Sequence, residues 1–230
     1  YILEKYSIAL SLGLQLLTPK HLAEEPLKVL AAGLVEPPSE FRMFPPLPEI
    51  KSEFNLINKA GVSKKQLLNK EFTSDTLEKN VNTTPFNILH LATHGQFSSQ
   101  PEKTFILAAD GAINVTQFDS LLRRRGESRS QALEMLVLSA WQTAAGDSRA
   151  TLGLAGVSVK AGARSTLASL WHINDKSTAI LMGEFYRELA KTKVTKAEAL
   201  RRAQLTLLKK YPNYERPGFW APYVLVGNCL

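Results

Sequence analysis

The sequence is short of the residues that would tie it to an oxidising compartment or to a membrane. Cys229 is the only cysteine among 230 residues, so the chain cannot form an internal disulfide or a metal site made of several cysteines. No apolar run reaches the roughly 18 residues of a membrane span, and the first residues lack the basic and small-residue regions of a signal peptide. These absences favour a protein of the reducing cytoplasm.

The charge is unbalanced but not concentrated. The chain has 28 Lys and Arg residues against 21 Asp and Glu residues, which gives a formal net charge of +7. A basic surface can attract nucleic acid, anionic lipid or acidic proteins. The basic residues are dispersed in short groups, and no zinc-finger spacing or RNA-binding aromatic signature accompanies them. Nucleic-acid binding is therefore kept only as a second alternative, and residues 123–129 are interpreted as a solvated loop.

The composition predicts one domain over residues 1–230. Hydrophobic residues make up 44% of the chain and charged residues 21%, which is enough apolar surface for one sizeable core. Because the first residue is Tyr and not Met, we expect this domain to be the C-terminal part of a longer protein.

The first 70 residues contain clear signals for starts and breaks of regular structure. Short apolar runs predict an opening hairpin and then a buried strand over residues 28–33. Five prolines between residues 36 and 48 exclude regular structure there and predict a loop. Helical periodicity resumes over residues 50–57, and residues 63–66 have the spacing of a helix capping box, which predicts another short helix.

Three mostly apolar runs have the length of buried strands and alternate with helical patterns. The runs cover residues 87–92, 134–140 and 165–171, the helical patterns cover residues 116–125, 151–160, 176–190 and 195–210, and a final strand covers residues 223–226. This alternation predicts an α/β layer sandwich with a largely parallel sheet. In such sheets, functional sites form beyond the carboxyl ends of the strands.

Two of these strand ends carry residues suited to chemistry. His94 and Gly95 follow the strand over residues 87–92, and the segment Ser-Ala-Trp-Gln-Thr covers residues 139–143. Position 141 lies 47 residues after His94, which is close to the roughly 50-residue spacing between the His and the Cys of caspases. A His beside a thiol supports attack on a peptide carbonyl, while backbone N–H groups hold the developing oxyanion.

Six stretches in order make a family resemblance specific. They are ILHLATHG (88–95), LAADG (107–111), LVLSAWQTAAGD (136–147), AGARSTLASLWHINDKST (161–178), AEALRRAQ (197–204) and WAPYVLVG (220–227). The chain resembles the CHAT domain, a caspase-like cysteine peptidase domain related to separases and gingipains and often fused to TPR repeats. The resemblance implies a three-layer α/β sandwich with helices on both faces, no cofactor and no metal, His94 as the ancestral base, and the Gly95 backbone in the oxyanion site.

The chain departs from the family at the nucleophile. The LSAC motif of the family reads LSAW here, so Trp141 occupies the nucleophile position. An indole cannot form a thioester. Ser139 and Thr143 are each displaced by about 6–7 Å along an extended strand, too far to replace the thiol. Cys229 is expected to be a small buried or terminal thiol.

The remaining site candidates each have a structural alternative. Asp175 either complements the dipole of a helix N-terminus or, as in the similar Trp-x-x-x-Asp segment of separases, receives a basic substrate side chain. Ser139, Asp147 and His172 are further candidates for the pocket, although Asp147 also suits a turn. His90 lies inside its strand and is interpreted as structural.

Together these observations predict a degenerate CHAT domain that is catalytically inactive and acts as a protein-interaction or regulatory module. The expected partners are a protein or peptide segment in the former substrate groove and TPR repeats in cis or in trans. The first alternative is an active CHAT-type cysteine endopeptidase whose nucleophile is altered at Trp141 in this chain.

Overall fold

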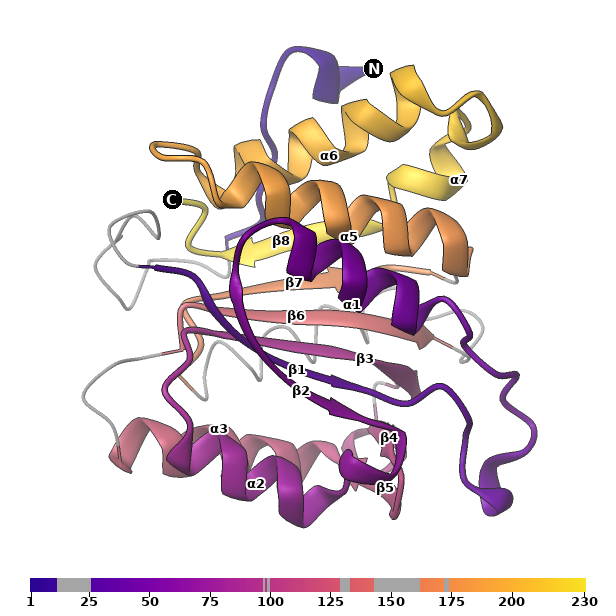
Figure 1. The fold of residues 1–230 in the computed structure, drawn as a ribbon, viewed down its shortest axis with the longest axis vertical. Helices are drawn as coiled ribbons and strands as arrows, with labels where there is room; N and C mark the ends of the chain where they lie inside the picture. Colours follow the sequence, from indigo (N-terminus) through magenta and orange to yellow (C-terminus); the bar gives the residue numbers. More distant parts are fainter. Residues whose placement is uncertain (12–25, 97, 99, 129–132, 143–161, 172–173) are drawn as a thin grey trace.

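The chain folds around one sheet with helices on both faces (Figure 1). The computed structural model describes residues 1–11, 26–96, 98, 100–128, 133–142, 162–171 and 174–230. The strands are β1 (Lys28–Gly33), β2 (Ser63–Leu68), β3 (Ile88–Gln96), β4 (Phe105–Ala108), β5 (Gly111–Asn114), β6 (Met135–Gln142), β7 (Ser165–Ser169) and β8 (Tyr223–Gly227). The α-helices of the described part are α1 (Ile50–Lys59), α2 (Ser74–Thr83), α3 (Val115–Ser128), α5 (Asp175–Leu189), α6 (Lys196–Lys210) and α7 (Pro217–Trp220).

The strand order across the sheet is β2-β1-β3-β6-β7-β8. All neighbouring pairs from β2 to β7 are parallel, and β8 joins β7 in the antiparallel direction. The hairpin of β4 and β5 attaches to the end of β3, where Gly95 pairs with Ile106. The three-layer α/β sandwich with a mainly parallel central sheet is therefore confirmed.

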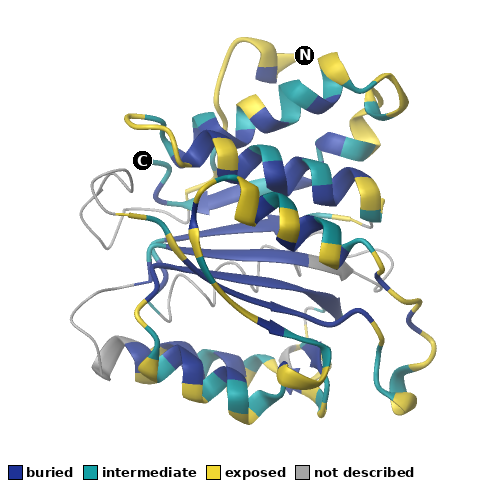
Figure 2. Cartoon of the chain, viewed as in Figure 1, coloured by how far each residue is buried: buried dark blue, intermediate teal, exposed yellow. Residues whose placement is uncertain are grey.

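Each face of the sheet has its own apolar core, because side chains alternate along the strands. Helices α1, α5 and α6 cover one face and α2 and α3 cover the other (Figure 1). On the first face, residues such as Ile88 and Val137 pack with Phe185 of α5 and Leu200 of α6. The central strands are buried along nearly their whole length, whereas the outer sides of the helices are exposed (Figure 2).

Most of the predicted elements are confirmed. Strands occur where the apolar runs predicted them, residues 36–48 form a loop with one short 3₁₀ turn at Ser39–Phe41, and α6 begins after Thr195, whose hydroxyl accepts the Glu198 N–H. The helix predicted over residues 151–160 lies outside the described residues, as does most of the predicted opening hairpin. In the part of the N-terminal segment that is described, Leu10 forms a parallel bridge to Val226 of β8.

Two predictions were wrong. Residues 63–68 form the edge strand β2 and not a helix, because the whole segment pairs in parallel with β1; tertiary pairing overrides the capping-box pattern. Residues 123–128 lie in α3 and not in a loop.

None of the helices in the described part of the chain has the length and apolar content needed to span a bilayer.

Candidate functional site at the ends of β3 and β6

The two predicted strand ends are brought together by the sheet. In the parallel ladder of β3 and β6, position 94 is the partner of position 141, and Gly95 is the partner of Gln142. Both strands run further than the sequence indicated, so His94 and Gly95 lie inside β3 and not in a loop after it. The reason is that β6 continues to Gln142 and β4 pairs with residues 95 and 96.

His94 is completely buried, and the proline-rich loop fixes its orientation. Its Nε2 lies 2.6 Å from the carbonyl oxygen of Pro45, and its ring centroid lies 5.0 Å from that of Phe44. A carbonyl oxygen only accepts, so Nε2 carries the hydrogen and donates it. In the neutral ring, Nδ1 is then the nitrogen that can take up a proton, which is the tautomer control that an imidazole base requires.

Pro45 is a site residue that the sequence reasoning missed. The proline-rich loop predicted an absence of regular structure, and that prediction is confirmed. Its contribution to the site is a backbone carbonyl, a group that every residue possesses. No side-chain motif could therefore have singled it out.

Asp175 lies at the junction of α1 and α5. Its Oδ2 accepts the backbone N–H of Glu49 at 2.9 Å, just before α1 begins. Asp175 is the first residue of α5 and is not its N-cap, because the side chain of Asn174 fills that role by accepting the Ser177 N–H. The carboxylate therefore joins the first turns of two helices that cover the same face of the sheet.

The electrostatic environment of Asp175 disfavours its charged form. Burial, first, and then the negative charges of Glu53 and Glu49 raise the pKa of Asp175 to about 6, against the opposing effect of the Glu49 N–H. No Lys or Arg of the described residues contributes to this balance. A half-buried carboxylate that no Lys or Arg of the described residues neutralises can meet a cation from outside.

Ser139 is buried, and its hydroxyl contacts other buried polar side chains. Its hydroxyl donates to Glu53 Oε2 at 3.2 Å and lies 3.4 Å from the hydroxyl of Tyr223. His90, which was predicted to be structural, is also fully buried, and its Nε2 lies 2.8 Å from Glu53 Oε1. Glu53 is the second site residue that the sequence reasoning missed.

Asp147 and His172, the other two predicted pocket residues, lie outside the described residues.

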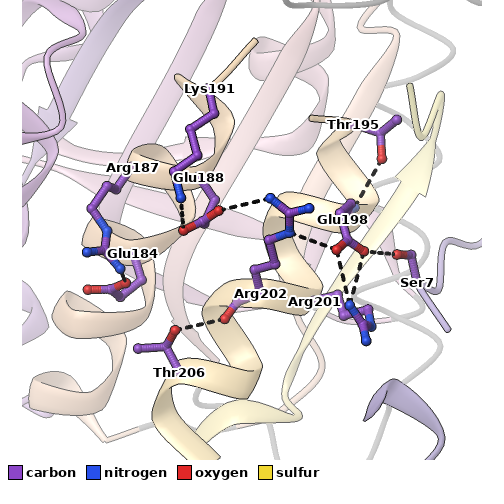
Figure 3. A network of polar contacts seen from close by, with 10 residues as sticks. All are labelled: Ser7, Glu184, Arg187, Glu188, Lys191, Thr195, Glu198, Arg201, Arg202 and Thr206. Carbon is purple, nitrogen blue, oxygen red and sulfur yellow. Dashed lines mark hydrogen bonds and ion pairs between the residues drawn. The ribbon is translucent and has the colours of Figure 1, made fainter. Parts of the chain in front are cut away.

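Many of the basic side chains are paired with acidic ones. Figure 3 shows one such network on α5 and α6, in which Arg202 contacts both Glu188 and Glu198 and Arg201 contacts Glu198. In the 123–125 group, Arg125 is buried and donates to the carbonyl oxygens of Val81 and Phe86. The other two arginines of that group form ion pairs with Asp119 and Glu78.

The fold, with its mainly parallel sheet between helices and its His in a central strand, is that of caspase-like cysteine proteinases. The chain is similar in structure to gingipain R (RGPB), an Arg-specific cysteine proteinase, with a TM-score of 0.57 and 11% identity over 88% of this chain and 46% of that one. It is equally similar to the complex of the RgpB pro- and mature domains of Porphyromonas gingivalis, with a TM-score of 0.57 and 12% identity over 88% of this chain and 47% of that one. The chain thus spans about half the length of these proteins, and the likeness defines the fold alone.

The family follows from the sequence. The family model described as CHAT domain matches residues 1–228, and the chain belongs to the CHAT domain family. No curated protein matches the chain in sequence.

Proposed function

We propose that this domain is a catalytically inactive member of the caspase-like peptidase fold and that it acts as a protein-interaction or regulatory module. One observation carries the proposal: position 141, the partner of His94 in the ladder, is a tryptophan. The geometry around His94 suits a general base, but a base accelerates only the attack of a group that has a proton to lose. An indole offers no such nucleophile.

The proposed ligand is an extended segment that carries Arg or Lys. Asp175 supports this choice, because burial and the charges of Glu53 and Glu49 raise its pKa to about 6 and no Lys or Arg among the described residues opposes them. A ligand ammonium or guanidinium would form a charge-assisted hydrogen bond in a partly desolvated place. Gingipain R, which has the same fold, is described as Arg-specific. TPR repeats, in cis or in trans, are the proposed context in which such a segment is presented.

Nucleic-acid binding is the less favoured reading of the +7 charge. The basic side chains around residues 123–125 are committed to ion pairs or to backbone carbonyls. Phosphate binding would depend on free Lys and Arg and would weaken steeply as salt rises. Binding at a half-buried carboxylate should survive moderate salt better, because buried pairs are less screened.

The binding test compares three proteins at two salt concentrations on arrays of basic and acidic peptides. They are the wild type, Asp175→Asn, and the matched control Asp119→Asn, which alters a partly exposed aspartate of α3. We expect Asp175→Asn to weaken basic-peptide binding about tenfold or more, as loss of a charge-assisted contact would. Unchanged binding in Asp175→Asn would show that Asp175 only links α1 and α5 and does not bind the basic segment.

The catalytic test uses fluorogenic peptides and thiol-directed peptide warheads. We expect no turnover and no labelling at the strand-end site of the wild type. Turnover that His94→Ala abolishes would reject inactivity. We further expect Trp141→Cys to introduce a thiol that is alkylated faster than Cys229, because His94 keeps the orientation that Pro45 gives it.

A further inference from the structure

A chain of polar side chains lies buried between α1 and the sheet. Glu53 of α1 is 2% exposed. Its Oε1 lies 2.8 Å from His90 Nε2 on β3, and its Oε2 accepts the Ser139 hydroxyl of β6 at 3.2 Å. His90 Nδ1 in turn lies 3.1 Å from the hydroxyl of Tyr186 on α5. One side chain of α1 therefore bridges the two central strands that carry positions 94 and 141.

The hydrogens of this cluster can be arranged so that each contact has one donor and one acceptor. Burial raises the pKa of Tyr186 well above its ordinary value, so its hydroxyl keeps its hydrogen and can donate to His90 Nδ1. His90 Nε2–H then donates to one oxygen of Glu53, and Ser139 donates to the other. Each oxygen of the carboxylate accepts one hydrogen bond from a different strand.

Such a cluster is a costly way to attach a helix. Burying a carboxylate removes its hydration, which neutral hydrogen bonds replace only in part, and an apolar side chain of the same size would pack there without that cost. What the cluster supplies and an apolar contact does not is direction, because hydrogen bonds fix both the position and the rotation of α1 over the strands.

The rotation and position of α1 matter because the chain just before it holds the site. Pro45, whose carbonyl orients His94, lies five residues before the first residue of α1. Glu49, whose N–H binds Asp175, immediately precedes the helix, and Glu53 N donates to the Glu49 carbonyl at 2.8 Å. A shift of α1 would therefore move both contacts together.

We propose that Glu53 is a positioning residue of the candidate site: by bridging His90 and Ser139 it fixes the start of α1 and, through it, the Pro45 carbonyl and the Glu49 N–H. This inference rests on the proposed function, since it concerns the same site. It assigns a role to a residue that touches neither His94 nor Asp175 through any hydrogen bond in the described part of the chain.

The test measures the Nε2 hydrogen of His94 by NMR of the ¹⁵N-labelled protein. Glu53→Leu removes both bridges while keeping a side chain of similar size. Ile57→Ala is the matched control, because Ile57 is a fully buried residue of the same helix, one turn later, without a polar group. We expect the His94 Nε2 hydrogen to exchange with solvent about tenfold faster in Glu53→Leu than in Ile57→Ala, after both are brought to equal global stability with urea.

Two further variants keep the inference falsifiable if Glu53→Leu does not fold. Glu53→Gln retains an acceptor for His90 and should exchange at nearly the wild-type rate, whereas Ser139→Ala removes one bridge and should exchange about threefold faster than wild type. Equal exchange in Ser139→Ala and wild type, or in Glu53→Leu and Ile57→Ala, would overturn the role of Glu53.

The affinity for a basic peptide is measured on Ser139→Ala and Ile57→Ala, because Ser139→Ala removes one bridge and leaves the Glu53 charge near Asp175 in place; it should fall in Ser139→Ala and not in Ile57→Ala. A wild-type protein that binds no basic peptide would reject the proposed function, while the exchange measurement would still decide the positioning role.

Discussion

Replacing Asp175 by Asn tests the electrostatics of the candidate site without any ligand. The pKa of Asp175 is raised from its ordinary 3.8 to about 6, mainly by burial and secondarily by Glu53 and Glu49. A carboxyl group with a raised pKa in the folded state contributes stability that is fully present below pH 3.8 and is lost as the pH rises through about 6. Above that pH the folded protein holds an unfavourable charge.

The size of the effect follows from the two pKa values. The difference between 3.8 and about 6 corresponds to about 3 kcal/mol. Because Asp175 is only partly buried, solvent screening reduces this to about 1–2 kcal/mol. Asn does not titrate, and its side-chain oxygen can still accept the Glu49 N–H. Asp175→Asn should therefore be more stable than the wild type by about 1–2 kcal/mol at pH 7.5 and nearly equal to it at pH 4.

Urea denaturation of both proteins at a series of pH values from 4 to 8 measures this difference. Asp119→Asn serves as the control, because it removes only a solvent-accessible ion pair with Arg123. Its free energy of unfolding should not exceed that of the wild type at pH 7.5. A variant that is less stable than the wild type at pH 7.5, or whose advantage is the same at every pH, would refute the argument and show that the Asp175 charge is compensated within the fold.

Three stability predictions concern the scaffold and use the same denaturation assay. A Cβ at Gly183 would lie 2.7 Å from Cβ of Leu56, so Gly183→Ala should cost about 1–3 kcal/mol, and adding Leu56→Ala should make that substitution less costly than it is alone. Arg125→Ala should cost about 2–4 kcal/mol because two buried carbonyls lose their donor, whereas Arg124→Ala should change stability by less than about 0.5 kcal/mol. Asp110→Ala removes the carboxylate that accepts the backbone N–H at the start of α2 and should cost about 1 kcal/mol. A reversed order of the two arginine variants would contradict the burial of Arg125.

The sheet could be predicted from the sequence because its central strands are buried on both faces. Such strands appear as continuous apolar runs, and their parallel direction follows from the helices that connect them. The edge strand β2 gave no such signal, since Leu67 is its only buried residue. Its backbone pairing with β1 decides its conformation, and that pairing is not visible in residues 63–68 themselves.

The candidate site could be predicted only where it consists of side chains in motifs. The His94 motif and position 141 were found, and the sheet places them side by side. The groups that orient the site were not found, because Pro45 contributes a carbonyl and Glu53 looks like a polar residue of an amphipathic helix. The burial of Glu53 depends on partners 37 and 86 residues away in the chain, and such contacts exist only once the sheet has formed.

The stability effect and the proposed binding are linked through the same carboxylate. A ligand cation beside Asp175 would lower its pKa toward the ordinary value, because it favours the charged form. Binding would thus remove the destabilisation that the isolated charge causes above pH 6, and the ligand should stabilise the fold more at pH 7.5 than at pH 4.5. Asp175→Asn lacks the charge and cannot show this dependence. We therefore expect the half-buried carboxylate of Asp175 to lower the stability of the fold above pH 6, and a basic ligand is the kind of partner that would restore it.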